Sequence, residues 1–255
     1  MEVNERKRGE KGGRKVGALV GKEIKKQGKG ASDFDLLYEG MEELAGRYGV
    51  SVAGGDLSVG TTLTLAVTVI GCPHPGIEPL RRSGAGAGDL LCVTGPLGAA
   101  AAGLALLEEP ALAGGVAEAP ALRDAQRRPQ PRVVEGRLLA GHGATAMMDI
   151  SDGLAIDAER LARASGLRAV LFVDRVPIAD GVVPVAAAAG RDHRLMALAG
   201  GEDYELLAAL PADRREALAA LLETPLVPVG SLEAGPPRLL YPSPSPRART
   251  RPRLP

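Results

Sequence analysis

From about residue 88 onwards the sequence alternates short apolar runs with helical patterns, and this alternation limits the possible folds most strongly. Runs such as "LLCVTG" and "RAVLFVD" have the length and composition of buried strands. Stretches such as "GAAAAGLALLEE" and "GLAIDAERLARASG" are typical of helices, and a glycine ends the second one. The alternation predicts a layered α/β or α+β domain. Strands are expected at residues 90–95, 145–150, 168–174, 204–210 and 226–232, and helices at 98–109, 132–143, 153–166 and 213–223.

The segment before residue 77 has a different pattern. A helix is expected at 32–49, with Ser32 or Asp33 as its N-cap. The run 50–56 predicts a short strand, and "TTLTLAVTVIG" at 61–71 alternates strictly, as a half-buried strand does. A Pro/Gly-rich stretch at 73–87 marks a boundary. We therefore predict two domains: a partial first domain with a mixed sheet plus a helix at 32–76, and a larger α/β domain at 77–240.

The charges of the chain divide into an acidic body and two basic ends. The whole chain has 31 basic and 31 acidic residues, but residues 31–240 hold 17 basic and 27 acidic ones. The Gly/Lys-rich segment 1–31 and the Pro/Ser/Arg-rich segment 241–255 are predicted to be disordered tails. An acidic body suits divalent-cation chemistry, although most such charge is simply solvated.

Several features favour a cytoplasmic protein. No apolar run is long enough to span a bilayer, and the basic N-terminus lacks the apolar core of a signal peptide. The two cysteines, Cys72 and Cys92, have no metal or redox spacing, so we expect ordinary small apolar residues in a reducing compartment.

The segment "MMDISDGLAIDAERL" places Asp149, Ser151 and Asp152 between an apolar run and a helical pattern. Two interpretations are open. Ser151 or Asp152 can cap the helix by accepting its free amide groups. Alternatively, the carboxylates can hold Mg²⁺ while the helix amides receive phosphate oxygens.

Three other loops carry similar groups, each with an ordinary structural alternative. "AGGDLSVG" places Asp56 after two glycines, which suits either a ligand site or a tight turn. In "LAGGEDYELLAAL", Glu202 and Asp203 precede a strand, as ligands or as solvated acids. In "LRRSGAGAGD", Arg81 or Arg82 can clamp a phosphate or lie on the surface.

Other common chemistries lack support. The sequence has no G-x-S-x-G, no P-loop and no G-x-G-x-x-G after a strand, and its three histidines have no plausible partners. Any bound nucleotide is therefore expected to be held through carboxylate-bridged Mg²⁺.

Four segments together resemble the thiamine-monophosphate kinases, which share a superfamily with the aminoimidazole ribonucleotide synthetases, the selenophosphate synthetases and a hydrogenase maturation factor. They span roughly residues 32–230 and read "LLYEGMEELAGRYGVSVAGGDLSVG", "LRRSGAGAGDLLCVTGPLGAAAAGLALL", "MDISDGLAIDAERLARASG" and "LAGGEDYELL". The resemblance implies a two-domain synthetase-like fold. It also implies transfer of the γ-phosphoryl group of ATP to thiamine monophosphate, with several Mg²⁺ ions bound.

The resemblance further implies roles for individual residues. Nucleotide contacts are expected at Tyr38, Gly55, Asp56, Arg82 and Ser151, metal ligands at Asp56, Asp149 and Asp152, and a thiamine contact at Glu202. No protein nucleophile is expected, because phosphoryl transfer depends on positioning and charge neutralisation. Neither a membrane nor a specific nucleic acid is an expected partner.

The chain departs from the family pattern at both ends. Nothing before Ser32 matches the family's aspartate-rich segments, and the aromatic substrate contact near its C-terminus is missing. We therefore expect impaired activity, an exposed apolar face at 61–71, and loss of the family's homodimer, which joins first-domain sheets. The alternatives are another enzyme of the superfamily, or a non-catalytic protein that binds Mg-nucleotide or, through its basic tails, a polyanion.

Overall fold

The computed structural model describes residues 33–58, 61–62 and 64–241. The chain divides into two compact units, Met1–Ile70 and Gly71–Pro255. The predicted tails at 1–31 and 241–255, except Tyr241, and the possible cap Ser32 lie outside the described residues.

The described part of the first unit contains one helix, α1 (Asp33–Arg47), at the predicted place. The strands predicted at 50–56 and 61–71 are wrong for the described residues, which are extended without ladder pairing. A strand needs a neighbour for its backbone N–H and C=O groups, and none of the described residues supplies one. The apolar face of 61–71 is exposed, as expected: Val67 is 71% and Val69 79% accessible.

The second unit is built around a six-stranded mixed sheet. Its strands are β1 (Leu90–Thr94), β2 (Ala146–Asp149), β3 (Arg168–Leu171), β4 (Leu206–Leu210), β5 (Leu226–Glu233) and β6 (Leu239–Leu240). Their order is β2-β4-β1-β5-β3-β6, and all neighbours are antiparallel except β3 and β6. All five predicted strands of this unit are confirmed, and the architecture is the predicted mixed α/β class.

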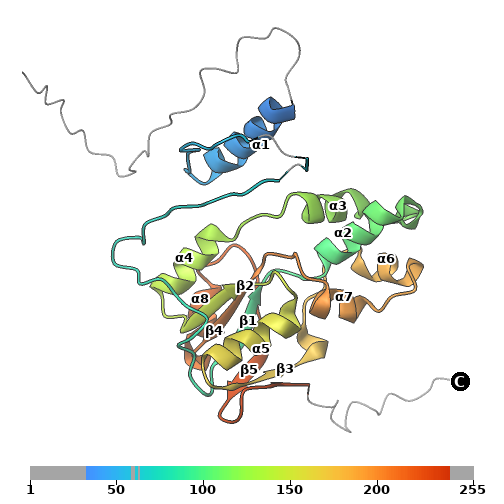
Figure 1. Ribbon diagram of the computed structural model, residues 1–255. Coiled ribbons are helices and arrows are strands. Elements are labelled where there is room, and N and C mark those ends of the chain that lie inside the picture. The colour runs from blue at the N-terminus through green and yellow to red at the C-terminus, as the bar shows by residue number, and fades with distance from the viewer. Residues whose placement is uncertain (1–32, 59–60, 63, 242–255) are drawn as a thin grey trace, which may run out of the picture. The chain divides into compact units, whose positions relative to one another are not determined.

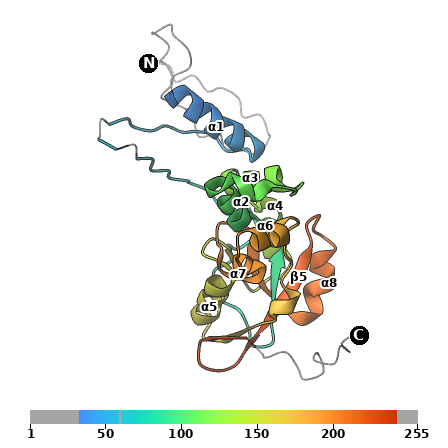
Figure 2. The ribbon, with the colours of Figure 1, turned by 90° about the vertical axis from the view of Figure 1, so that its right-hand side faces the viewer.

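Helices cover both faces of this sheet (Figure 1). They are α2 (Ala99–Glu108), α3 (Ala119–Arg127), α4 (Val133–Gly141), α5 (Leu154–Ala164), α6 (Val182–Ala188), α7 (His193–Ala199) and α8 (Arg215–Ala219), with 3₁₀ turns at Pro110–Ala113, Val173–Arg175 and Ala212–Arg214. Figure 2 shows α5 and α7 on one side of β5 and α8 on the other. The helices α3, α6 and α7 were not predicted; α3 and α6 each contain a proline, which usually marks a break in a helical pattern.

The central strands are apolar on both faces, because each face has its own core. On β1, Leu91 and Val93 pack in the cluster that includes α5, whereas Cys92 packs in the cluster that includes α4 and α8. This arrangement explains the nearly continuous apolar runs of the sequence. Burial raises the pKa of Cys92 to about 12, in agreement with its expected role as an apolar core residue.

A third cluster joins α2, α3 and α6 through alanine, leucine and valine side chains. The helices α2 and α3 approach so closely that a Cβ at Gly103 would lie 2.0 Å from the carbonyl oxygen of Leu122. Gly103 is therefore required by packing, because backbone atoms of α3 cannot rotate away as a side chain can.

We predict that Gly103→Ala lowers the free energy of unfolding by at least about 1 kcal/mol, because the clash outweighs the gain in helix propensity. Gly136→Ala in α4 is the matched control: its Cβ would meet side-chain atoms at an ordinary 3.6 Å. The control should be neutral or stabilising by about 0.5–1 kcal/mol. Urea denaturation followed by circular dichroism measures both, and equal effects would contradict the packing argument.

Candidate functional site

The pairing of β2 with β4 brings two acidic loops together at one end of the sheet. Asp149, the last residue of β2, is opposite Leu206, the first residue of β4. Backbone hydrogen bonds continue this ladder into the loops: the amide of Tyr204 donates to the carbonyl of Ile150 (2.9 Å), and that of Glu202 to the carbonyl of Ser151 (2.8 Å). The loops 149–153 and 200–205 therefore form one surface.

The second loop has an unusual backbone. Glu202 and Tyr204 have positive φ angles of 60° and 51°, and Gly201 has a φ of 67°. Non-glycine residues rarely adopt this region, and such strain is often found at functional sites. A Cβ at Gly201 would lie 2.7 Å from the carbonyl oxygen of Ser151, so the glycine permits the contact between the loops.

The first loop is held by a residue of the helix that follows it. The carboxylate of Asp157, in the first turn of α5, accepts hydrogen bonds from the amides of Ser151 (3.1 Å) and Asp152 (3.0 Å). The side chain of Asp157 is fully buried. Burial raises the pKa of Asp157, although these amides and Arg160 act to lower it.

The capping interpretation of the sequence is therefore wrong. The N-cap residue of α5 is Gly153, and no side chain accepts a hydrogen bond there. Asp152 instead forms an ion pair with Arg160, and its side chain is 51% accessible. The acids of this loop are available at the surface, because the loop is held from below by Asp157.

The two loops create a region of negative potential around Tyr204. The hydroxyl of Tyr204 donates to the carboxylate of Glu202 at 3.1 Å. Desolvation raises the pKa of Tyr204, and Glu202, Asp149 and Asp152 raise it further. The structure thus brings four predicted residues together: Asp149, Ser151, Asp152 and Glu202.

These residues do not form an all-protein metal cage. In the part of the chain that the structure describes, no group of three or more His, Cys, Asp or Glu side chains is placed to hold a metal ion. Mg²⁺, however, usually takes one or two carboxylates together with waters and substrate phosphates. The hard oxygen ligands of Asp149 and Asp152 fit that mode of binding.

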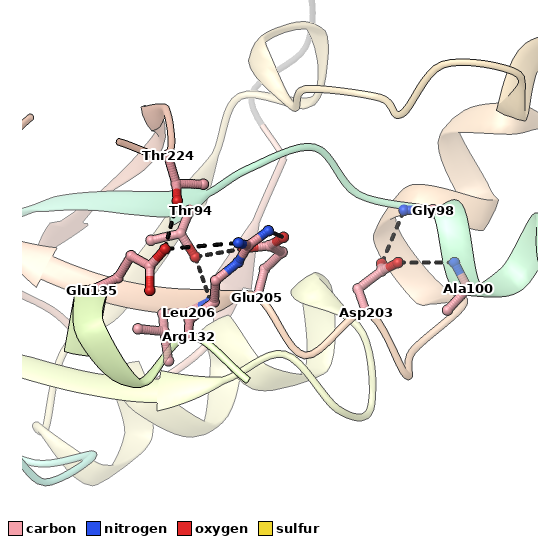
Figure 3. Close-up of polar contacts among 9 residues, drawn as sticks. All are labelled: Thr94, Gly98, Ala100, Arg132, Glu135, Asp203, Glu205, Leu206 and Thr224. Atoms are coloured by element: carbon pink, nitrogen blue, oxygen red, sulfur yellow. Dashed lines mark hydrogen bonds and ion pairs between the residues drawn. The ribbon is translucent and has the colours of Figure 1, made fainter. Parts of the chain in front are cut away.

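A buried polar network supports the second loop from behind (Figure 3). Glu205 is 6% accessible and accepts two hydrogen bonds from Arg132, from Nε at 2.8 Å and from Nη2 at 2.5 Å. The hydroxyl of Thr94 donates to Glu205 at 2.7 Å and accepts from the amide of Leu206 at 2.8 Å. The ion pair therefore links the segment before α4 to β1 and to the start of β4.

Asp203 is not one of the solvated acids that the sequence allowed. Its carboxylate accepts hydrogen bonds from the amides of Gly98 (2.9 Å) and Ala100 (3.2 Å), at the N-terminus of α2 (Figure 3). Asp203 thereby caps α2, whose own N-cap residue Gly98 has no side chain. Burial raises the pKa of Asp203 to about 6, although these hydrogen bonds act to lower it. Glu202, by contrast, is exposed.

In the first unit, two residues predicted to contact nucleotide lie together. A Cβ at Gly55 would lie 3.4 Å from the hydroxyl oxygen of Tyr38. The exposed carboxylate of Asp56 accepts a hydrogen bond from Ser58 at 3.5 Å. The roles of these residues stay predictions.

Arg82 does not lie beside the two acidic loops. Its carbonyl accepts a hydrogen bond from the hydroxyl of Ser165, which follows the last turn of α5. Ser151 and Asp152 precede the first turn of this eleven-residue helix, which at 1.5 Å per residue is about 16 Å long. The role of Arg82 in nucleotide binding stays a prediction.

The sequence analysis missed Thr94, Arg132, Asp157 and Glu205, although two of them carried a signal. Asp157 interrupts the apolar face formed by Leu154, Ala158 and Leu161, all fully buried. Glu205 is likewise a charged residue in an otherwise apolar strand pattern. A buried charge requires partners, so each of these positions indicated a polar network.

The fold and the site define a class of protein: an α/β domain with a mixed sheet and an acidic, glycine-lined pair of loops at one end of it. The chain belongs to the family described as AIR synthase related protein, C-terminal domain, which matches residues 86–238.

Within this family the chain is similar to thiamine-monophosphate kinases. It is 40% identical over 167 residues to the thiamine-monophosphate kinase of Mycobacterium tuberculosis (strain CDC 1551 / Oshkosh), a match that covers 64% of this chain and 47% of the relative. The crystal structure of thiamine-monophosphate kinase from Stenotrophomonas maltophilia K279a matches with a TM-score of 0.57 and 37% identity, over 64% of this chain and 52% of that one. A structure of AaThiL complexed with AMPPCP and TMP matches with a TM-score of 0.55 and 31% identity, over 64% and 50%. The chain thus spans about half the length of these relatives.

We predict that Arg132→Met lowers the free energy of unfolding by about 3 kcal/mol, because it leaves the buried carboxylate of Glu205 without its charged partner. The double variant Arg132→Met/Glu205→Gln should recover much of this loss, because no buried charge remains. Chemical denaturation of the single and double variants measures the coupling. If the double variant loses as much free energy of unfolding as the two single variants together, the ion pair is not the dominant interaction of this network.

A pH prediction follows from Asp203. Its pKa is about 6 in the folded chain, against an ordinary value of 3.8, so the folded chain binds more protons than the unfolded chain between these values. Stability relative to Asp203→Asn should therefore rise as the pH falls, by about 2 kcal/mol between pH 7 and pH 4.5. Thermal or urea unfolding of both proteins across this range measures the difference. If the relative stability instead falls as the pH is lowered, the ionised carboxylate of Asp203 is a better cap for α2 than its protonated form.

Proposed function

We propose that this chain acts in the ATP-dependent phosphorylation of thiamine monophosphate to thiamine diphosphate. The observation that carries this proposal is the backbone ladder that joins loops 149–153 and 200–205, because it gathers residues with the required chemistry from two separate segments. The similarity to thiamine-monophosphate kinases, one of them complexed with AMPPCP and TMP, supports the choice of substrates.

Phosphoryl transfer needs charge neutralisation and orientation rather than a protein nucleophile. Mg²⁺ would supply this neutralisation, held in the second unit by Asp149 and Asp152. Asp56, in the first unit, stays a predicted metal ligand. Ser151 would donate to a phosphate oxygen of ATP. No histidine or cysteine is required.

Glu202 is suited to the thiamine end of the acceptor, because the thiazolium ring of thiamine is positively charged. The hydrogen bond from Tyr204 orients this carboxylate, and the left-handed backbone of both residues limits the directions in which it can point. The positioning of the acceptor thus depends on a strained turn that Glu205 and Asp203 hold from inside.

Tyr38 and Gly55, both in the first unit, and Arg82, in the second, are the other residues proposed to contact ATP. A Cβ at Gly55 would lie close to the hydroxyl of Tyr38, which supports a shared role for these two residues. The nucleotide contact of Arg82 rests on the resemblance and on the exposure of its side chain.

The setting of the reaction also stays a prediction. Among the described residues no helix is long and apolar enough to cross a membrane. Cytoplasmic location, reduced activity and an altered dimer are expectations from the sequence.

The proposal is tested by assaying purified full chain for conversion of ATP and thiamine monophosphate to thiamine diphosphate, with Asp149→Asn, Asp152→Asn and the control Asp213→Asn. We expect each loop variant to lose about 10²-fold or more in kcat/KM, because each ligand contributes a few kcal/mol to neutralising phosphate charge. Asp213 is exposed in the 3₁₀ turn Ala212–Arg214, so its variant should match the wild type.

Two results would contradict the proposal. Equal activity in all four proteins would exclude the loop 149–153 from the site. Binding of Mg-ATP without turnover would instead support the alternative of a non-catalytic nucleotide-binding protein.

A further inference from the structure

Arg160 lies between two carboxylates of the candidate site. Its Nη1 atom donates to Oδ2 of Asp152 and also lies 3.2 Å from Oδ1 of Asp157. The other oxygen of Asp157 is already occupied by the amides of Ser151 and Asp152. One guanidinium group thus lies between two acids and reduces the repulsion between them.

The two contacts of Arg160 differ in environment. Asp157 is fully buried, whereas Asp152 and Arg160 are 51% and 46% accessible. An exposed ion pair contributes little net free energy, and water or another cation can replace it. We therefore expect Arg160 to lose its contact with Asp152 more easily than its contact with the buried carboxylate of Asp157.

A divalent cation bound by Asp152 would compete with Arg160 for this carboxylate, whose Oδ2 atom accepts the hydrogen bond from the guanidinium. Both positive charges cannot lie against one carboxylate without repulsion, so binding of the cation requires the guanidinium to withdraw. Its remaining contact with Asp157 gives it a position close by, and Asp157 would then still hold the loop.

We propose that Arg160 is an internal counter-ion that occupies Asp152 in the absence of metal and is displaced from it when Mg²⁺ binds. Arg160 therefore weakens the affinity of the loop for Mg²⁺, while Asp157 holds the loop in place. This inference rests on the proposed function, because that function assigns Asp152 to the metal.

The test compares Mg²⁺ binding to the full chain and to two variants of α5. Arg160→Gln removes the counter-ion but keeps a side-chain donor for Asp157. Arg163→Gln is the matched control: it removes the same charge from the same helix, where Arg163 pairs with Glu159 at 2.7 Å. Isothermal titration with MgCl₂ at low salt gives each Kd, and circular dichroism checks folding.

We expect Arg160→Gln to bind Mg²⁺ about three- to tenfold more tightly than the wild type, because no ion pair has to be broken. Arg163→Gln should change Kd by less than about twofold. Arg160→Lys, which keeps the charge, should restore a Kd close to that of the wild type.

Three results would overturn the inference. Weaker binding by Arg160→Gln would mean that Arg160 holds Asp152 ready for the metal. Equal tightening by Arg160→Gln and Arg163→Gln would mean that only the overall charge matters; in both cases the proposed function stands. Absence of Mg²⁺ binding in every protein would overturn the inference together with the metal role of Asp152, and the turnover assay then decides the proposed function separately.

Discussion

The antiparallel pairing of β2 with β4 is the interaction on which the candidate site depends. These strands are far apart in the sequence, and their ladder continues beyond the sheet through the backbones of Ile150, Ser151, Glu202 and Tyr204. Backbone hydrogen bonds place the two acidic loops against each other before any side chain takes part. Such an arrangement is tolerant of changes in surface side chains but needs Gly201, because the loops meet with no room for a Cβ.

Two buried acids, Asp157 and Glu205, and the half-buried Asp203 support this surface, and each is partnered. Asp157 holds the amides of the first loop, Asp203 caps α2, and Glu205 pairs with Arg132. A buried carboxylate is costly without partners, so each acid orders the segments that provide them. The exposed acids Asp152 and Glu202 and the half-buried Asp149 can then serve a ligand, because the structure of the loops does not depend on them.

The element types and the class of the second unit could be predicted, because the apolar runs of β1, β4 and β5 lie between two cores and leave a clear pattern. The helices α3, α6 and α7 were missed; α3 and α6 each contain a proline, a residue that usually indicates a loop or the end of a helix. In the segment 61–71, by contrast, a strand was predicted that the described residues do not form. The alternation of apolar and polar side chains is present, but a strand forms only where a neighbour accepts its backbone hydrogen bonds.

By itself, the sequence determined which residues carry chemistry: acids and a hydroxyl next to glycines, in loops that join apolar strands and helices. Only the tertiary structure decided which of these acids face outward and which are buried. Local pattern placed Glu202 and Asp203 together, yet one is exposed and the other caps a helix about one hundred residues earlier in the chain. The physical reason is that the partner of a buried charge is chosen by long-range strand pairing, and the spacing of residues within a single loop contains no information about it.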